Sequence, residues 1–169
     1  MTSETLTPPI RLLPEDAPRL QALYTRCIGY FLRADGQPPR ETAANEAFVD
    51  VPEGHSPDQL ALYGVFAPTE ELVAEMEVLE GYPNASVWWI GLLLVDPAAR
   101  RRGIARRMVE WLSARAAEKR IAEIQLGVLD SNLEARRFWE GEGFTWLRST
   151  EPRRFGQLEH VVHVLTRKV

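Results

Sequence analysis

A nine-residue apolar segment, from Val87 to Val95, constrains the fold of this chain more than any other feature. Successive side chains of a β-strand point to opposite faces of a sheet, and here both sets are apolar. Such a strand needs cover on both faces, so we expect it at the centre of a sheet that helices pack against. It ends at Asp96-Pro97 and is far shorter than the ~20 residues that a membrane-spanning helix requires.

The other apolar patterns predict strands and helices around this central segment. Alternating or short apolar runs predict further strands at residues 10–13, 60–66, 72–79, 121–128, 144–148 and 159–166. Helical spacing predicts one continuous helix after Asp16 that reaches Phe31, a short helix over 44–51, a helix from about Arg102, and a helix that Ser131 caps and that ends at Gly141 or Gly143. This order of elements is typical of an α/β fold with a mixed sheet.

Length and composition indicate one globular domain over residues 1–169. Hydrophobic residues make up 45% and charged residues 26% of the chain, as in ordinary globular proteins. The single cysteine excludes an intrachain disulfide and fits a reducing compartment. The first ten residues contain Glu4 and two prolines and lack an apolar core, so they do not resemble a signal peptide. We therefore expect a cytoplasmic protein with no membrane partner.

Charge is concentrated in one short segment. Residues 96–107 contain five arginines and one aspartate, whereas the whole chain has a net charge of −4. One basic spot in an acidic chain favours a small polyanionic ligand and opposes a nucleic-acid partner, which would need a broad basic surface. The alternative is that these arginines form a solvated helix face.

The basic segment also has the local pattern of an anion site. A buried strand stops at Val95, a tight turn follows, and a helix begins with Gly103 and Ala105 near its start. The first N–H groups of a helix lack intrahelical partners and carry its positive dipole end, so they bind phosphate. No Gly-Lys-Ser/Thr follows and only one glycine is present, which excludes a Walker loop and a dinucleotide fingerprint.

A second motif, taken together with the first, resembles a known family. It reads Asn132-x-x-Ala135-x-x-Phe138-Trp139-x-x-x-Gly143-Phe144, and the first reads Arg100-x-x-Gly103-x-Ala105. Both, in this order, resemble motifs of the GCN5-related N-acetyltransferases, and the order of predicted elements agrees over nearly the whole chain. The resemblance implies a mixed, mostly antiparallel sheet with a splayed parallel strand pair at its centre and helices on both faces.

The resemblance also implies where acetyl-CoA binds. It would lie between two splayed strands, 87–95 and 121–128, with a bulge near Gly91. The backbone of Leu93 and Val95 would pair with pantetheine, and the backbone N–H of Leu94 would be the oxyanion donor. The other implied cofactor contacts are the amides of Arg102, Gly103, Ile104 and Ala105, the charges of Arg100 and Arg101, the side chain of Asn132, and the neighbouring Ala135 and Phe138.

The sequence departs from the family at the expected acid and base. Trp139 stands where many members have a tyrosine that protonates the leaving thiolate, and an indole N–H cannot be lost at useful pH. Trp89 stands where one branch has a glutamate base. Glu77, or less favourably Glu75, could serve as the base, although both could simply lie on a solvated strand face. Tyr82 is a looser candidate for the acid.

The main hypothesis is an enzyme that moves the acetyl group of acetyl-CoA to a primary amine of a small molecule or peptide by direct attack. A homodimer is possible, and no metal is implied, because His160 and His163 are expected on opposite faces of one strand. A non-enzymatic acyl-CoA-binding module is the alternative, motivated by the missing tyrosine and glutamate. The sequence carries no motif that identifies the acceptor.

Overall fold

The computed structural model describes residues 5–169, so the first four residues of the amino-terminal segment discussed above lie outside it. The strands are β1 (Ile10–Arg11), β2 (Leu60–Phe66), β3 (Leu72–Glu80), β4 (Val87–Val95), β5 (Glu123–Leu129), β6 (Thr145–Ser149), β7 (Arg153–Phe155), β8 (Leu158–His160) and β9 (Val162–Lys168). The helices are α1 (Ala17–Arg26), α2 (Ile28–Asp35), α3 (Ala43–Glu46), α4 (Ile104–Glu118) and α5 (Leu133–Gly141). None of the helices in this described range has both the length and the apolar character needed to cross a membrane.

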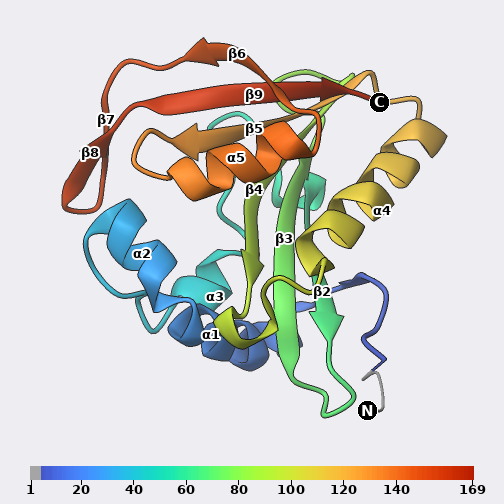
Figure 1. The fold of residues 1–169 in the computed structure, drawn as a ribbon, viewed down its shortest axis with the longest axis vertical. Helices are drawn as coiled ribbons and strands as arrows, with labels where there is room; N and C mark the ends of the chain where they lie inside the picture. Colours follow the sequence, from blue (N-terminus) through green and yellow to red (C-terminus); the bar gives the residue numbers. More distant parts are fainter. Residues whose placement is uncertain (1–4) are drawn as a thin grey trace.

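Seven strands form one sheet in the order β1-β2-β3-β4-β5-β9-β6, and β7 and β8 form a separate hairpin (Figure 1). All pairs in the sheet are antiparallel except β4 with β5. The expected mixed, mostly antiparallel sheet with one parallel pair at its centre is therefore confirmed.

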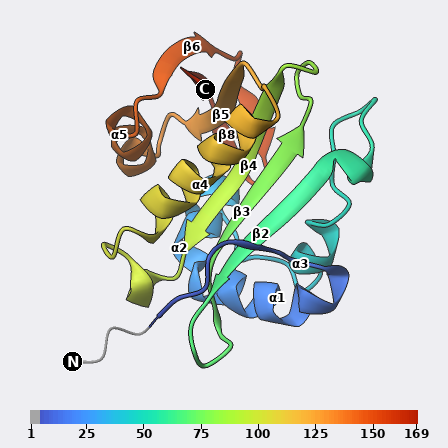
Figure 2. The same ribbon diagram turned by 90° about the vertical axis from the view of Figure 1, so that its right-hand side faces the viewer.

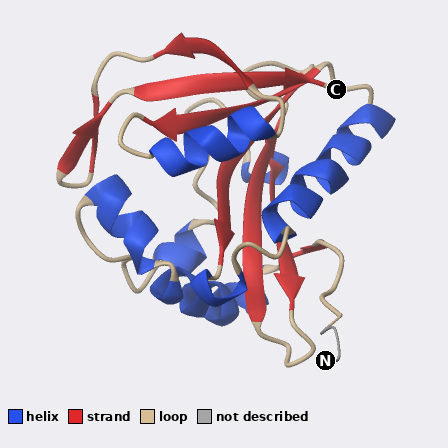
Figure 3. Ribbon diagram, viewed as in Figure 1, coloured by secondary structure: helices blue, strands red, loops and turns tan. Residues whose placement is uncertain are grey.

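Helices cover both faces of the sheet, as the apolar segment 87–95 predicted (Figures 2 and 3). On one face α4 and α5 pack on the sheet through a core that includes Met108, Leu112 and Trp139. On the other face α1 and α3 pack through a core that includes Leu20, Leu23 and Ala44. β4 contributes to both cores, which explains why it is apolar on both sides.

A β-bulge at Gly91 divides β4 into two halves. Glu77 of β3 pairs with Leu92 and Val78 pairs with Ile90, so Gly91 is left without a partner. The extra residue reverses the alternation of side chains: Trp88 and Ile90 enter the core under α4, whereas Leu92 and Leu94 enter the core under α1. The bulge that the family resemblance implied near Gly91 is confirmed.

The same place in the sheet is where β4 and β5 separate. Their parallel pairing covers only Val87–Ile90 and Glu123–Leu126. Beyond it, β5 continues along β9 alone, while β4 remains paired only with β3 (Figure 1). The splayed strand pair expected from the resemblance is thus confirmed.

The expected helix from Asp16 to Phe31 is wrong, because two helices replace it. α1 ends at Arg26 and α2 begins at Ile28, and Cys27 between them has a ψ of 23°, which breaks the helical backbone. The apolar stripe continues through the break, so periodicity could not reveal it. Cys27 itself is 1% exposed and belongs to the core, as expected.

Smaller differences concern element ends. Asn132, rather than Ser131, caps α5, because its side chain accepts a hydrogen bond from the backbone N–H of Ala135. The expected helix over 44–51 is confined to Ala43–Glu46. The expected strand over 159–166 is interrupted at Val161, so His160 and His163 lie on different strands, β8 and β9. The β7–β8 hairpin, rich in exposed polar residues, was not expected.

Buried ionic contacts hold α1 against the carboxyl end of β4. Asp96, only 6% exposed, accepts a hydrogen bond from Nε of Arg26 and another, 2.8 Å long, from the backbone N–H of Ala98. Arg26 also donates to the carbonyl of Leu72 at 2.7 Å. The turn after β4 is therefore fixed by the end of α1.

We expect Asp96→Ala to lower the free energy of unfolding by about 2–4 kcal/mol, because it leaves the partly buried Arg26 without its main partner and the turn without its cap. Chemical denaturation measures this change. The control is Glu140→Ala, which removes the exposed pair with Arg136 and should cost less than about 1 kcal/mol. Equal effects of the two substitutions would show that Asp96 is not a structural anchor.

Candidate functional site

The separation of β4 from β5 opens onto a cavity of about 510 Å³. Its walls come from Leu93–Val95 of β4, the turn and helix start between Pro97 and Arg106, one face of α5, and Tyr30 and Arg33 of α2. Beyond Ile90, β4 pairs with no strand other than β3, so its other edge has no strand partner. An extended amide-containing ligand can pair with such an edge.

The turn before α4 forms the cationic end of this cavity. Gly103, with a φ of +73°, takes the left-handed conformation that glycine adopts without strain and immediately precedes the helix. A side chain at Gly103 would meet no atom within 4 Å, so the space in front of the first N–H groups of α4 is open. Arg100 is held against the strand end by a 3.1 Å hydrogen bond to the carbonyl of Val95. This arrangement suits a phosphate group.

The structure brings nearly all the predicted cofactor residues together. Those that line the cavity are Leu93, Val95, Arg100, Arg101, Gly103, Ile104, Ala105, Asn132, Ala135 and Phe138, joined by Leu94 and Trp139 of the predicted catalytic set. Arg102 does not line it, although it lies in the same turn. Arg33, which the sequence analysis missed, does line the cavity and donates to Oδ1 of Asn132 at 3.2 Å.

Trp139 forms a wall of this cavity. It is 7% exposed, and its ring packs edge-on against Phe138 and Phe144 with centroid distances of 4.9 and 5.2 Å. Oδ1 of Asn132 is occupied by the N–H of Ala135 and by Arg33, which leaves its amide NH₂ group as the part that can donate to a ligand.

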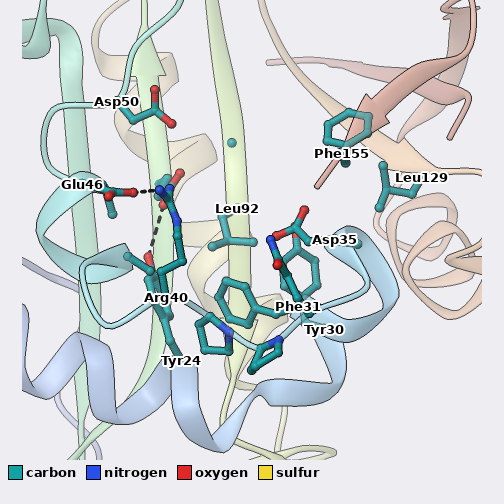
Figure 4. A pocket seen from close by; sticks show the side chains of 18 residues that line it. Tyr24, Tyr30, Phe31, Asp35, Arg40, Glu46, Asp50, Leu92, Leu129 and Phe155 are labelled. Carbon is teal, nitrogen blue, oxygen red and sulfur yellow. Dashed lines mark hydrogen bonds and ion pairs between the residues drawn. The ribbon is translucent and has the colours of Figure 1, made fainter. Parts of the chain in front are cut away.

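A second cavity, of about 290 Å³, lies on the other side of the bulge (Figure 4). Tyr30 lines both cavities, and the second is bounded by Tyr24, Glu77, Gly91 and Leu92 as well as by α2, α3 and the loop between them. Glu77, unlike the other predicted site residues, faces this second space. The two cavities therefore meet beside the bulge, one with cations and a free strand edge, the other with a carboxyl group.

Glu77 lies close to Gly91, where a side chain would crowd it. A side chain at Gly91 would bring its Cβ to 3.1 Å from Oε2 of Glu77. The hydroxyl of Tyr24 donates to Oε1 of Glu77 at 3.4 Å. Burial raises the pKa of Glu77 to about 7; the hydrogen bond from Tyr24 lowers it in part, and the charge of Asp50 raises it. A group with this pKa can accept and release a proton near neutral pH.

Glu75 lies two residues earlier on the same face of β3 and is 0% exposed. Neither of its carboxyl oxygens has a hydrogen-bond partner among the described residues. Burial raises the pKa of Glu75 well above its usual range, and the charge of Glu77 raises it further. The alternative of a solvated strand face is therefore wrong, because α1 covers this face.

Tyr82, the looser candidate for the acid, lines neither cavity and packs against His55 and Trp89. No sequence pattern marked Tyr24 and Tyr30 as site residues, and both fall within the helix that was expected after Asp16. Sequence analysis also missed Asp35 and Asp50, which stand near loop ends where no local pattern marks them.

Comparison with known proteins agrees with this geometry. The family model of the acetyltransferase (GNAT) family matches residues 20–144, so the chain belongs to that family. Among curated protein sequences none matches the chain.

Solved structures share the fold. An acetyltransferase from Thermus thermophilus superposes with a TM-score of 0.81 at 21% identity and 100% coverage of both chains. The ribosomal-protein-S18-alanine N-acetyltransferase of Escherichia coli gives 0.70 at 17% identity, covering 98% of this chain and 94% of that one. A GCN5-related N-acetyltransferase from Kribbella flavida gives 0.70 at 18% identity, covering 97% and 98%. At these identities the likeness shows the fold alone.

The buried Glu75 should make stability depend on pH in a defined direction. Between its ordinary pKa and its raised pKa, the folded state holds a proton that the unfolded state has released. Stability should therefore fall as pH rises from about 5.5 to 7, by up to ~1.4 kcal/mol per pH unit for this one proton. Glu75→Gln should flatten that slope, as measured by denaturation at several pH values.

The control is Glu118→Gln, which changes an exposed carboxyl near the end of α4 and should leave the slope as it is. A slope that is identical in wild type and Glu75→Gln would contradict the raised pKa of Glu75.

Proposed function

We propose that this protein transfers an acetyl group from acetyl-CoA to a primary amine of a small molecule or peptide by direct attack. The observation that carries the proposal is the meeting of two cavities at the bulge of β4. One has a free strand edge and a basic helix start, and the other has Glu77. Acetyl-CoA supplies the acyl group activated as a thioester. The first cavity suits its extended, polyanionic body, and the second has room for an amine.

The residues of the first cavity would bind and orient the co-substrate. The amides from Arg102 to Ala105 and the guanidinium groups of Arg100 and Arg101 would hold the pyrophosphate. The edge of β4 at Leu93 and Val95 and the NH₂ group of Asn132 would hold the pantetheine amides. The N–H of Leu94, the donor that the family resemblance implied, points to β3, because Leu94 pairs with Glu75 in the same ladder in which Asp96 donates to Val73. A donor to the thioester oxygen would therefore come from the free edge of β4 on either side of Leu94.

Glu77 would accept the proton that the amine must lose. An alkylammonium cannot attack, so the amine must first lose one proton to water. Glu77 must be ionised to take the second proton, which the nitrogen releases once it has attacked. The nitrogen then forms a bond to the acetyl carbon, the carbon–sulfur bond breaks, and the amine proton passes to Glu77, directly or through water. Trp139 cannot protonate the sulfur, so water would do so, which is adequate because a thiolate leaves readily. Trp139 would act as a wall that positions the ligand.

The absence of the family's tyrosine at position 139 and of its glutamate at position 89 favours a second candidate, a module that binds acyl-CoA without turnover. Thiol release from acetyl-CoA across a panel of amino acids, polyamines, aminoglycosides and peptide amino termini separates the two. A module that only binds releases no thiol with any of them.

CoA should raise the melting temperature by ligand linkage, with a gain of ~2.7 kcal/mol at about 100 times its dissociation constant. Gly103→Glu should abolish the gain, because it places a negative charge in the phosphate seat. The control is Gly54→Glu, since Gly54 also has a positive φ and open space around it but lines neither cavity. A full gain in melting temperature with CoA in Gly103→Glu would show that the phosphate does not bind at this turn.

Glu77→Gln should lower kcat about 10²-fold near neutral pH, because the variant cannot accept the proton. In the wild type, kcat/KM should rise with pH through about 7 as Glu77 ionises, and this limb should disappear in the variant. Tyr24→Phe should move the limb to higher pH, since it removes the hydrogen bond that lowers the pKa of Glu77. Thiol release measured with the best acceptor of the panel tests all three; identical profiles would show that water is the base.

A further inference from the structure

The two cavities that meet at the bulge carry opposite charge. The first contains four arginines and one carboxylate, namely Arg33, Arg100, Arg101, Arg106 and Glu134. The second contains four carboxyl groups and one arginine, namely Asp35, Glu46, Asp50, Glu77 and Arg40. The cationic cavity, which suits a polyanion, therefore adjoins an anionic cavity of about 290 Å³. Electrostatic complementarity of this kind selects ligands by charge.

The single arginine of the anionic cavity already forms an ion pair within the chain. Arg40 pairs with Glu46 (Figure 4). Glu46 also accepts a hydrogen bond from the hydroxyl of Thr42. Within residues 5–169, no lysine, arginine or histidine pairs with Asp35, Asp50 or Glu77. Three carboxyl groups are thus left without a counter-ion around one cavity.

Asp35 stands where helix electrostatics disfavour a carboxylate. It is the last residue of α2, close to the negative end of the helix dipole. The β7–β8 hairpin fixes it there, because the N–H of Gln157 donates to its carbonyl at 2.8 Å and Gly156 packs against it. Figure 4 shows Asp35 and Asp50 on opposite sides of Leu92, with the rings of Tyr30 and Phe31 on the Asp35 side. A carboxylate at the carboxyl end of a helix is stabilised by a nearby cation, so a positively charged ligand would bind favourably at Asp35.

Glu75 is completely buried on the same face of β3 as Glu77, and both of its oxygens lack a partner among the described residues. Glu75 does not line the cavity, and the proton that it retains leaves it neutral, so the negative charge of this space comes from the carboxyl groups that line it.

We propose that the acceptor of this enzyme is a dication: an amine that carries a second positively charged group. The reacting amine would lie at Glu77 beside the bulge, and the second ammonium would pair with Asp35 at the end of α2. The rings of Tyr30 and Phe31 would cover the methylene chain between them. Acceptors with a carboxylate in place of the second ammonium would be repelled. This inference rests on the proposed acetyl transfer.

The transfer itself balances with the same residues. The reacting ammonium of the acceptor first loses a proton to water. The neutral amine then forms the new carbon–nitrogen bond, the carbon–sulfur bond breaks, Glu77 takes the second proton from that nitrogen and the thiolate takes a proton from water. The distal ammonium stays charged throughout, because Asp35 stabilises its protonated form.

The test compares three acceptors of equal length by thiol release from acetyl-CoA: butane-1,4-diamine, butylamine and 4-aminobutanoate. We expect kcat/KM to be at least about tenfold higher for the diamine than for butylamine, the effect of one charge-assisted hydrogen bond, and lowest for 4-aminobutanoate. Asp35→Asn should bring the ratio of diamine to butylamine close to one. The matched control is Asp58→Asn, an exposed aspartate that lines neither cavity, which should keep the wild-type ratio.

The outcomes separate the two proposals. If no amine of any charge releases thiol, the proposed function is wrong, and so is the proposal that the acceptor is a dication. If amines are acetylated but butylamine or 4-aminobutanoate reacts as well as the diamine, only the dication is overturned. The same holds if Asp35→Asn keeps the preference of the wild type.

Discussion

The unpaired Gly91 in β4 decides where both cavities lie. One extra residue reverses the side-chain alternation of the strand, so Leu92 and Leu94 turn toward the α1 side while Leu93 and Val95 face the α4 side. The same irregularity coincides with the end of the β4–β5 pairing, which frees a strand edge for a ligand. Because position 91 has no side chain, Glu77 can lie across the bulge at the junction of the two cavities. A regular strand would provide neither the free edge nor the space for this carboxyl group.

The break between α1 and α2 completes the site from the other face of the sheet. Arg26 fixes the end of α1 to Asp96, and the thiol of Cys27 lies 3.6 Å from the carbonyl of Val95. From this anchored point α2 starts in a new direction and carries Tyr30 to the boundary of the two cavities. A continuous helix would follow the α1 axis past Arg26. The ionic contacts at the end of β4 therefore help to place the walls of a cavity as well as to stabilise the fold.

The sequence predicted those parts of the structure that depend on local pattern. The apolar strand, the basic turn and the Asn132 motif each depend on residues close together in the chain, and their fold and the family were confirmed. The burial of Glu75 could not be predicted in this way, because alternation of glutamate with apolar residues is typical of a half-solvated strand, and the helix that covers it lies about fifty residues earlier. The α1–α2 break escaped prediction because tertiary contacts of Arg26 and Cys27 impose it. Asp35 and Asp50 come to line one cavity only through the fold of the segment between them, and no local pattern marks either residue.

The two glutamates of β3 are chemically unequal, and the difference follows from their donors. An ionised carboxylate in a buried place needs hydrogen-bond donors, and Glu75 has none among the described residues, so it keeps its proton as pH rises. Glu77 receives the hydroxyl of Tyr24 and borders a cavity, so its ionised form is less costly and its pKa is lower, at about 7. Two nearby carboxyl groups also disfavour a double negative charge, so the proton that Glu75 retains makes it easier for Glu77 to ionise. Glu77 is therefore the member of the pair that loses its proton first, and it is the one that faces the space where an amine can bind.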